Sequence, residues 1–265
     1  MTHPFTYVDP NAKLASNVKI DPFTVIHGDV KIGEGTWIGS NVTIMEGTRI
    51  GKNCRIFPGA VIGAIPQDLK FNGEKTFVEI GDNTTIREFV TINRGTNDRG
   101  KTKVGNNCLI MAYSHIAHDC FIGNSCIMSN SVQVAGHVDI GDFAIIGGVS
   151  AVHQFVHIGQ HTFIAGGSLV SKDVPPYIKA VRNPLSYGGV NSVGLKRRGF
   201  SLEQINHILD IYRIIYNKGF NTSQAIDYIE EEIQASDERD EIIMFIRDSG
   251  RGIIKRFTKG VSEYD

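Results

Sequence analysis

A period of six residues runs through most of the chain. Of the 28 positions reached from Val8 to Val170 in steps of six, 25 are Val, Leu, Ile or Met. A period of six fits neither the alternation of a strand nor the 3.6-residue repeat of a helix, and it is typical of a parallel β-helix built from hexapeptides. The pattern therefore predicts a β-helix over residues 1–175, in which each hexad is a short extended segment with one aliphatic side chain turned inward.

Two polar stretches interrupt the repeat. Its three exceptions, Asp68, Glu74 and Asp98, fall within residues 64–77 and 93–103. Because the period resumes in phase after each stretch, we expect both to be loops extruded from an otherwise continuous array.

Helical signals replace the hexads after Pro175. Ser201 and Gln204 form a capping box ahead of an apolar pattern at helical spacing, and Gly219 marks its end. Two further helices are expected at about 221–234 and 237–248. We expect residues 176–265 to be an α-helical domain that caps the open edge of the last coil.

Glycine and cysteine usage agrees with the repeat. Many of the 29 glycines directly follow the aliphatic residue, as in Ile32-Gly33, and we interpret them as bends with positive φ. The cysteines share the fifth position of their hexads, which predicts small core residues rather than redox or metal-binding groups: Cys54, Cys108, Cys120 and Cys126.

Charge and hydropathy exclude some classes. With 27 basic and 28 acidic side chains the net charge is −1, which argues against a generic nucleic-acid binder. No apolar stretch approaches the roughly 18 residues of a membrane span, and the first residues do not resemble a signal peptide. These features favour a cytoplasmic protein.

Candidate chemistry gathers where histidines cluster. Six of the nine histidines lie between residues 115 and 161, and His115 and His118 stand beside Asp119. Imidazole titrates near neutral pH and suits general-base catalysis, whereas Asp119 can orient His118 only at an irregular bend, because adjacent strand residues face opposite ways. We expect His157 and His161 to lie on the solvated surface.

Resemblance to left-handed β-helix acyltransferases implies three hexads per coil, so that residues 18 apart stack. Gly136 would then lie on His118, where its backbone N–H suits an oxyanion. Six strings carry a closer resemblance: Pro66-Gln67-Asp68-Leu69-Lys70, Val90-Thr91-Ile92-Asn93-Arg94-Gly95-Thr96, His115-Ile116-Ala117-His118-Asp119-Cys120, Ala144-Ile145-Ile146-Gly147-Gly148, Ala151-Val152-His153-Gln154-Phe155 and Gly194-Leu195-Lys196-Arg197-Arg198-Gly199-Phe200. In this order they resemble the acyl-carrier-protein:UDP-N-acetylglucosamine O-acyltransferases, which begin lipid A synthesis.

The resemblance implies a reaction and a set of roles. An (R)-3-hydroxyacyl group would pass from acyl carrier protein to the 3-hydroxyl of UDP-N-acetylglucosamine, without metal or other cofactor. His118 matches the general base, Asp119 its partner and Gly136 the oxyanion donor. Further matched positions bind the sugar, the nucleotide with its phosphates, or the acyl chain: Gln67, Asp68, Lys70, His115, His137, His153, Gln154, Gly166, Asn191, Arg197 and Arg198.

The resemblance also implies a homotrimer with each site between two subunits, in a Gram-negative-type bacterium. Val193 stands where an acidic residue is expected, and Gly166 would leave room for a long acyl chain. A basic-leaning stretch, with Arg87, Arg94, Arg99, Lys101 and Lys103, is a candidate docking surface for the acidic carrier protein or simply a solvated loop.

Three alternatives stay open at this stage. The first is another hexapeptide acyltransferase, N-acylating or dependent on acetyl-CoA. The second is a zinc β-helix enzyme of the γ-carbonic anhydrase type, with His115, His118 and His137 as ligands. A non-catalytic scaffold is the third, and it leaves the histidine cluster unexplained.

Overall fold

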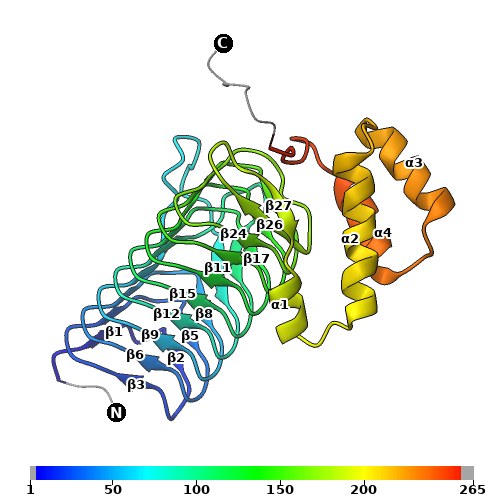
Figure 1. The fold of residues 1–265 in the computed structure, drawn as a ribbon. Coiled ribbons are helices and arrows are strands. Elements are labelled where there is room, and N and C mark those ends of the chain that lie inside the picture. The colour runs from blue at the N-terminus through cyan, green and yellow to red at the C-terminus, as the bar shows by residue number, and fades with distance from the viewer. Residues whose placement is uncertain (1–3, 258–265) are drawn as a thin grey trace.

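The computed structural model describes residues 4–257, and most of this chain winds into a three-sided parallel β-helix (Figure 1). Along the first sheet lie β1 (Tyr7–Val8), β4 (Val25–Ile26), β7 (Thr43–Ile44), β10 (Val61–Ala64), β13 (Thr91–Asn93), β16 (His115–Ile116), β19 (Gln133–Val134), β22 (Ala151–Val152) and β25 (Leu169–Val170). Along the second lie β2 (Lys13–Leu14), β5 (Lys31–Ile32), β8 (Thr48–Ile50), β11 (Phe77–Ile80), β14 (Lys101–Val104), β17 (Phe121–Ile122), β20 (Asp139–Ile140) and β23 (His157–Ile158). Along the third lie β3 (Lys19–Ile20), β6 (Trp37–Ile38), β9 (Arg55–Ile56), β12 (Thr85–Ile86), β15 (Leu109–Ile110), β18 (Ile127–Met128), β21 (Ile145–Ile146), β24 (Phe163–Ile164), β26 (Ile178–Val181) and β27 (Ser186–Val190).

The pairing register confirms three hexads per coil. His115 pairs with Gln133 and Gln133 with Ala151, each 18 residues further along the chain. Two loops leave this array, residues 65–76 between β10 and β11 and residues 94–100 between β13 and β14. The second loop is shorter than the predicted 93–103 because Lys101–Val104 pairs with β11 as strand β14.

The aliphatic residue of each hexad points into the prism. Ile26, Ile56 and Ile116 are examples with no exposed surface, and one buried hydrophobic cluster runs the length of the β-helix. The four cysteines are free thiols buried in this cluster, as the sequence predicted. Burial of a whole ladder of Ile and Val side chains, each removed from water, is what stabilises coils with so few residues per strand.

The glycines after the aliphatic residues, apart from Gly63 with its φ of 86°, have a different function from the one predicted. A Cβ atom on Gly33 would stand 2.7 Å from the backbone of Gly51 in the next coil, and the φ angle of Gly33 is not positive. Positive φ occurs instead three residues after the aliphatic position, for example at Asn53 (54°) and Asp119 (58°). These glycines are therefore required by the close approach of stacked backbones, and not by the bend.

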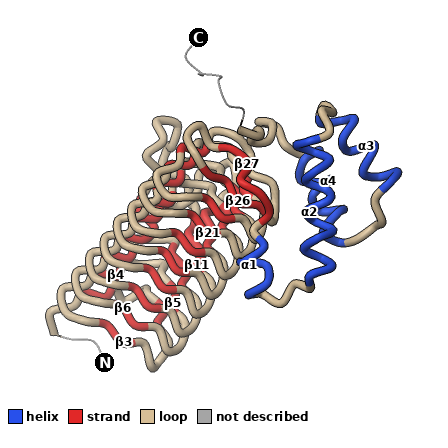
Figure 2. The backbone as a smooth tube through the Cα atoms, viewed as in Figure 1, coloured by secondary structure: helices blue, strands red, loops and turns tan. Residues whose placement is uncertain are grey.

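The helical part follows the last coil and lies beside its end (Figures 1 and 2). Its helices are α1 (Ser192–Arg197), α2 (Leu202–Asn217), α3 (Thr222–Glu232) and α4 (Asp237–Arg247). The predicted capping box at the start of α2 is present, with Ser201 accepting from the Gln204 backbone and the Gln204 side chain accepting from the Ser201 backbone. The three long helices agree with prediction within about three residues, whereas α1 was not predicted.

The helices attach to the last coil through specific contacts. The fully buried Tyr212 of α2 donates to the carbonyl of Pro176 at 2.6 Å, and Tyr177 hydrogen-bonds to Glu241 of α4. Strands β26 and β27 lie after residue 175, so paired strands continue as far as Val190. We propose residue 175 as the approximate boundary between the β-helix and the C-terminal domain. Within residues 4–257, no helix combines the length and apolar character needed to cross a bilayer.

Candidate active site

The β-helix has three edges, which we call corners. Corner 1 joins the first and second sheets and includes residues 117–120, 135–138 and 153–156. Corner 2 joins the second and third sheets, with residues 123–126, 141–144 and 159–162. Corner 3 joins the third and first sheets, with residues 129–132, 147–150 and 165–168. The predicted site residues are distributed over all three.

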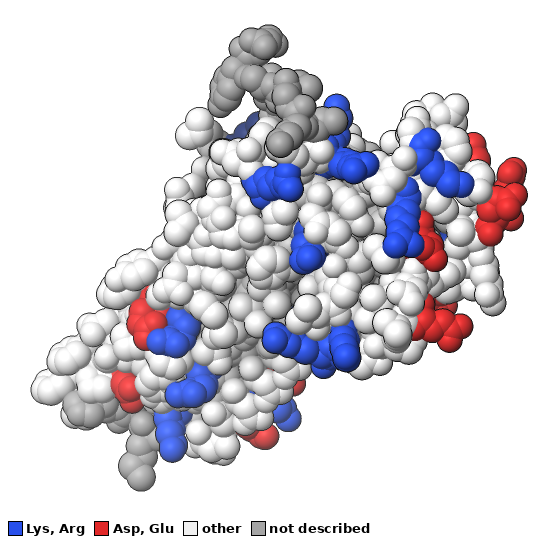
Figure 3. Space-filling model, viewed as in Figure 1, with Lys and Arg blue, Asp and Glu red and all other residues white. Residues whose placement is uncertain are grey.

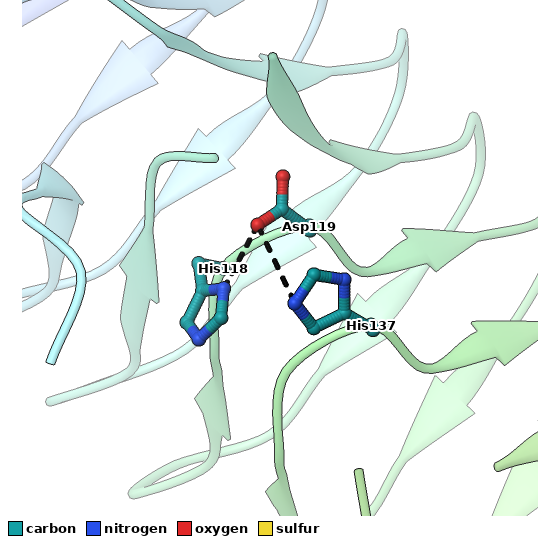
Figure 4. A group of neighbouring side chains, drawn as sticks. All are labelled: His118, Asp119 and His137. Carbon is teal, nitrogen blue, oxygen red and sulfur yellow. Dashed lines mark hydrogen bonds and ion pairs between the residues drawn. The ribbon is translucent and has the colours of Figure 1, made fainter. Parts of the chain in front are cut away.

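His118 and Asp119 lie in contact at corner 1 (Figure 4). The left-handed backbone of Asp119 bends the chain, so that two adjacent side chains meet with His118 Nδ1 2.8 Å from Asp119 Oδ2. A carboxylate only accepts hydrogen bonds, so Nδ1 of His118 carries the proton and Nε2 is left as the basic nitrogen. The sequence predicted that Asp119 could orient His118 only at an irregular bend, and the chain has such a bend at Asp119.

Asp119 is fully buried and surrounded by donors. The backbone N–H and the hydroxyl of Thr96 donate to it, the latter at 2.7 Å, and the backbone N–H of Arg99 donates at 3.2 Å. Burial alone would raise the pKa of Asp119, but the hydrogen bonds from His118, Thr96 and Arg99 outweigh it and lower the pKa to about 2. Asp119 is thus held ionised and in one orientation.

Sequence reasoning missed the hydrogen bonds of Thr96 and Arg99 to Asp119, and it considered Arg99 only for carrier-protein docking. Both come from loop 94–100, whose course no periodicity predicts, and the guanidinium of Arg99 also pairs with Asp139 at 2.5 Å. The only available signal was the string that contains Thr96, and it was used for resemblance alone.

Gly136 and His137 stack on this pair from the next coil. A Cβ atom on Gly136 would stand 2.7 Å from both Cε1 and Nε2 of His118. His137 packs edge-on against the His118 ring at 5.0 Å between centroids, and its nitrogens lie 3.2 Å from Asp98 and 3.9 Å from Asp119. The predicted 18-residue stacking therefore places the His118, Asp119, Gly136 and His137 positions together.

The residues expected to hold the sugar lie on the approach to His118. Loop 65–76 brings Asp68 Oδ2 to 4.0 Å from His118 Nε2, while Gln67 and Lys70 beside it are exposed. His115 Nδ1 lies 2.7 Å from the Thr91 hydroxyl, and burial together with His118 lowers the pKa of His115 and keeps it neutral.

The remaining predicted residues lie apart from His118 or face solvent. His153 and Gln154 are exposed on the next coil of corner 1, and Gly166 is exposed at corner 3. Asn191 is buried, where its side chain caps α1 and donates to the His161 carbonyl at corner 2. Arg197 is exposed on α1, and Arg198 donates to the Phe143 carbonyl at corner 2.

The expectation for His161 was wrong. Its side chain is 6% exposed and packed among aromatic rings, because the helical part covers corner 2 at this coil. His157 agrees better with expectation, since 45% of its side chain is exposed beside Asp139.

One group of described residues has the spacing of a metal site. Ligand atoms of His118, Asp119 and His137 all lie within 4.8 Å of one another. This set differs from the three histidines considered from sequence, since it contains Asp119 and does not contain His115.

The basic-leaning stretch is largely engaged in contacts within the chain. Arg87 pairs with Glu88, Arg99 with Asp139 and Lys101 with Glu79, and the Arg94 guanidinium lies over the Phe71 ring. On the face drawn in Figure 3, much of the β-helix surface carries neither basic nor acidic side chains. The paired cations present little free charge to a docking protein.

Known proteins match this chain over most of its length. The family model described as UDP N-acetylglucosamine O-acyltransferase, domain 2, matches residues 173–254, and the bacterial transferase hexapeptide model matches residues 29–64 and 101–136. An acyl-[acyl-carrier-protein]–UDP-N-acetylglucosamine O-acyltransferase of a Sulfurihydrogenibium species is 57% identical over 258 residues, which are 97% of this chain and 95% of that protein. One from a Janthinobacterium species is 46% identical over 260 residues, 96% of this chain and 99% of that protein.

Solved structures of UDP-N-acetylglucosamine acyltransferases also match this chain over nearly its full length. A UDP-N-acetylglucosamine acyltransferase from Bacteroides fragilis matches with a TM-score of 0.95 at 53% identity, covering 96% of this chain and all of that one. One from Acinetobacter baumannii has a TM-score of 0.93 at 43% identity, with 96% and 99% covered. The prediction of a left-handed parallel β-helix with a helical C-terminal part is confirmed.

Proposed function

The chain belongs to the family of acyl-[acyl-carrier-protein]–UDP-N-acetylglucosamine O-acyltransferases, and we infer its activity from this membership. It is an acyltransferase that transfers an (R)-3-hydroxyacyl group from acyl carrier protein to the glucosamine 3-hydroxyl of UDP-N-acetylglucosamine, the first step of lipid A biosynthesis. The observation that carries the mechanism is the His118–Asp119 pair, with Nε2 of His118 left free to accept a proton.

We propose that His118 is the general base. Its Nε2 takes the proton of the 3-hydroxyl as that oxygen attacks the thioester carbonyl, and ionised Asp119 stabilises the imidazolium that forms. The N–H of Gly136 would stabilise the oxyanion of the tetrahedral intermediate. When the C–S bond breaks, the imidazolium returns its proton to the thiolate of the carrier, so that protons and charge balance.

The other predicted residues have proposed roles in binding. Asp68 lies close enough to His118 to position the sugar, with Gln67, Lys70 and His115 around it. For the nucleotide and phosphates we propose three residues of corner 1 and three from the start and end of α1: His137, His153, Gln154, Asn191, Arg197 and Arg198. A planar guanidinium suits phosphate oxygens. Gly166 at corner 3 is proposed to border the acyl chain.

The distribution of these residues supports a homotrimer with each site between subunits. His118 lies at corner 1, whereas Arg198 contacts corner 2 and Gly166 lies at corner 3, so these groups stand on different edges of one prism. A second copy could bring its corner 2 or 3 to corner 1 of the first. Leu69, fully exposed at the tip of loop 65–76, is an apolar side chain that such a neighbour would cover. We propose a cytoplasmic location together with this reaction.

One assay tests this function against its alternatives. Purified protein is offered (R)-3-hydroxyacyl thioesters of carrier protein or of CoA, with UDP-N-acetylglucosamine or UDP-glucosamine as acceptor. The proposal expects an O-acylated product from the carrier-protein thioester and the N-acetylated sugar. Preference for the CoA thioester, or an N-acylated product, would favour another hexapeptide transferase.

One observation favours the alternative function as a zinc enzyme: ligand atoms of His118, Asp119 and His137 lie close enough together to hold a metal ion. Metal analysis of the active protein, followed by chelation, separates the two. Retention of full activity after chelator treatment and dialysis supports the metal-free mechanism. Stoichiometric zinc whose removal abolishes activity and whose return restores it would overturn that mechanism.

A further inference from the structure

His161 is held at the centre of an aromatic stack at corner 2. Its ring lies parallel to Phe143 at 4.8 Å and to Tyr177 at 5.7 Å, while Phe200, after α1, meets it edge-on at 5.1 Å. The backbone of His161 is fixed as well, since its carbonyl accepts from the buried Asn191 side chain at 2.9 Å. Such an imidazole can neither rotate freely nor touch a ligand.

Arg198 is the charged side chain in hydrogen-bond contact with this ring in the part of the chain that the structure describes. Its Nη1 atom lies 3.5 Å from His161 Nδ1, and its Nη2 atom donates to the Phe143 carbonyl at 2.9 Å. The guanidinium lies over the Phe143 ring, 5.2 Å from its centroid. A guanidinium has five N–H donors, so three of them have no partner within residues 4–257.

The charge state of His161 matters for this contact. Burial and the Arg198 charge lower the pKa of His161 to about 4, and the opposing influence of Asp142 does not reverse this. His161 is therefore neutral near pH 7 and its Nδ1 can accept from Arg198. An imidazolium there would repel the guanidinium and offer no acceptor.

We propose that His161 is a positioning residue for substrate binding: with the Phe143 carbonyl it fixes the Arg198 guanidinium so that the three unpaired donors are presented to the diphosphate of the nucleotide sugar. The inference rests on the proposed function, in which Arg198 binds phosphate. The inference goes beyond that function because it gives a role to His161, a buried residue that is not among the proposed substrate-binding residues.

The test uses a variant that lacks the Nδ1 acceptor of His161 but keeps an aromatic ring at this position. His161→Phe preserves stacking with Phe143 and Tyr177 and removes Nδ1. Because a hydrogen bond to a charged group is lost, we expect the KM for UDP-N-acetylglucosamine to rise about tenfold, with kcat and the KM for the acyl carrier protein within about twofold of wild type. If His161→Phe fails to fold, His161→Gly serves the same test, since it also removes Nδ1 and glycine readily adopts the left-handed backbone found at this position (φ 56°).

A double-mutant cycle with Arg198→Ala shows whether a negative result contradicts the phosphate contact of Arg198 or the positioning role of His161. We expect Arg198→Ala to raise the same KM, and His161→Phe to add little in that background. An unchanged KM in Arg198→Ala would show that the proposed phosphate contact is wrong. If Arg198→Ala raises the KM but neither His161 variant does, or if the two effects are fully additive, the positioning role is overturned while the proposed function stands.

Discussion

Gly136 and His118 touch across one step of the β-helix, with no space between them for a side chain. A Cβ atom at residue 136 would stand 2.7 Å from both Cε1 and Nε2 of the His118 ring, where real Cβ contacts essentially never occur. Glycine at this position therefore leaves the basic nitrogen unobstructed and lets a backbone N–H approach the reacting carbonyl.

Gly136→Ala should lower kcat by about a hundredfold or more, because the added methyl group displaces the His118 ring from its position beside the acyl carbonyl. Steady-state kinetics with saturating substrates measures the effect. Gly250→Ala is a matched control, since a Cβ atom there meets nothing within 4 Å and the φ angle is not positive. A Gly136→Ala enzyme with the kcat of the control would contradict the close-contact explanation.

Asp119→Asn should reduce kcat by roughly a hundredfold while KM values change little, because a neutral amide no longer stabilises the imidazolium of His118. Asp82→Asn provides the control. Asp82 accepts a backbone N–H at a coil bend, in the same manner as the side chains of Asn106 and Asn124 in later coils. Equal activity of the two variants would remove Asp119 from the mechanism.

The buried histidines predict a loss of stability in acid. The pKa of His161 in the folded chain is about 4, below the 6.5 of the unfolded chain, and that of His115 is shifted in the same direction. As pH falls below about 6.5 the unfolded state takes up protons first, so the free energy of unfolding decreases until about pH 4, by about 3 kcal/mol for His161.

Urea denaturation at several pH values between 4 and 7 measures this loss. His161→Phe should lose less stability than wild type over that range, because it has no proton to take up at this position. Parallel pH dependences for the two proteins would mean that His161 is protonated as readily in the folded chain as in the unfolded one.

Gly166 gives a prediction about acyl length. A glycine at corner 3 leaves the proposed acyl groove open, so wild type should prefer long (R)-3-hydroxyacyl groups, and Gly166→Met should shift the optimum to shorter ones. Carrier-protein thioesters of graded length measure both. The kcat/KM for UDP-N-acetylglucosamine, measured with each enzyme's best donor, serves as the internal control. Fastest reaction of wild type with the shortest donor would refute the proposal.

The sequence predicts the fold well because hexads impose it locally. Each aliphatic side chain must point inward and each coil must stack on the previous one. Three hexads per coil were implied by the family resemblance, and the resulting repeat of 18 residues places Gly136 on His118. Loop 94–100 follows no such rule, which is why the contacts from Thr96 and Arg99 to Asp119 could not be predicted.

His161 shows a different limit of the repeat. The hexad pattern identifies it as a corner residue, and corner residues of other coils are often exposed, as Phe23 and Phe89 are. Burial of His161 depends on Phe200 and Tyr177, which lie beyond the last hexad and pack back over corner 2. The packing of Phe200 and Tyr177 over corner 2 is a tertiary contact, which the hexad pattern does not predict.

The central claim is that His118 is the base for acyl transfer, and one rate comparison tests it most directly. Initial rates with (R)-3-hydroxyacyl carrier protein and UDP-N-acetylglucosamine are measured for wild type and His118→Ala, with thermal unfolding as a check on folding. His118 is not part of the inward aliphatic ladder, so the variant should fold. We expect its rate to fall by at least about a thousandfold; a folded His118→Ala protein with a rate within tenfold of wild type would contradict the claim.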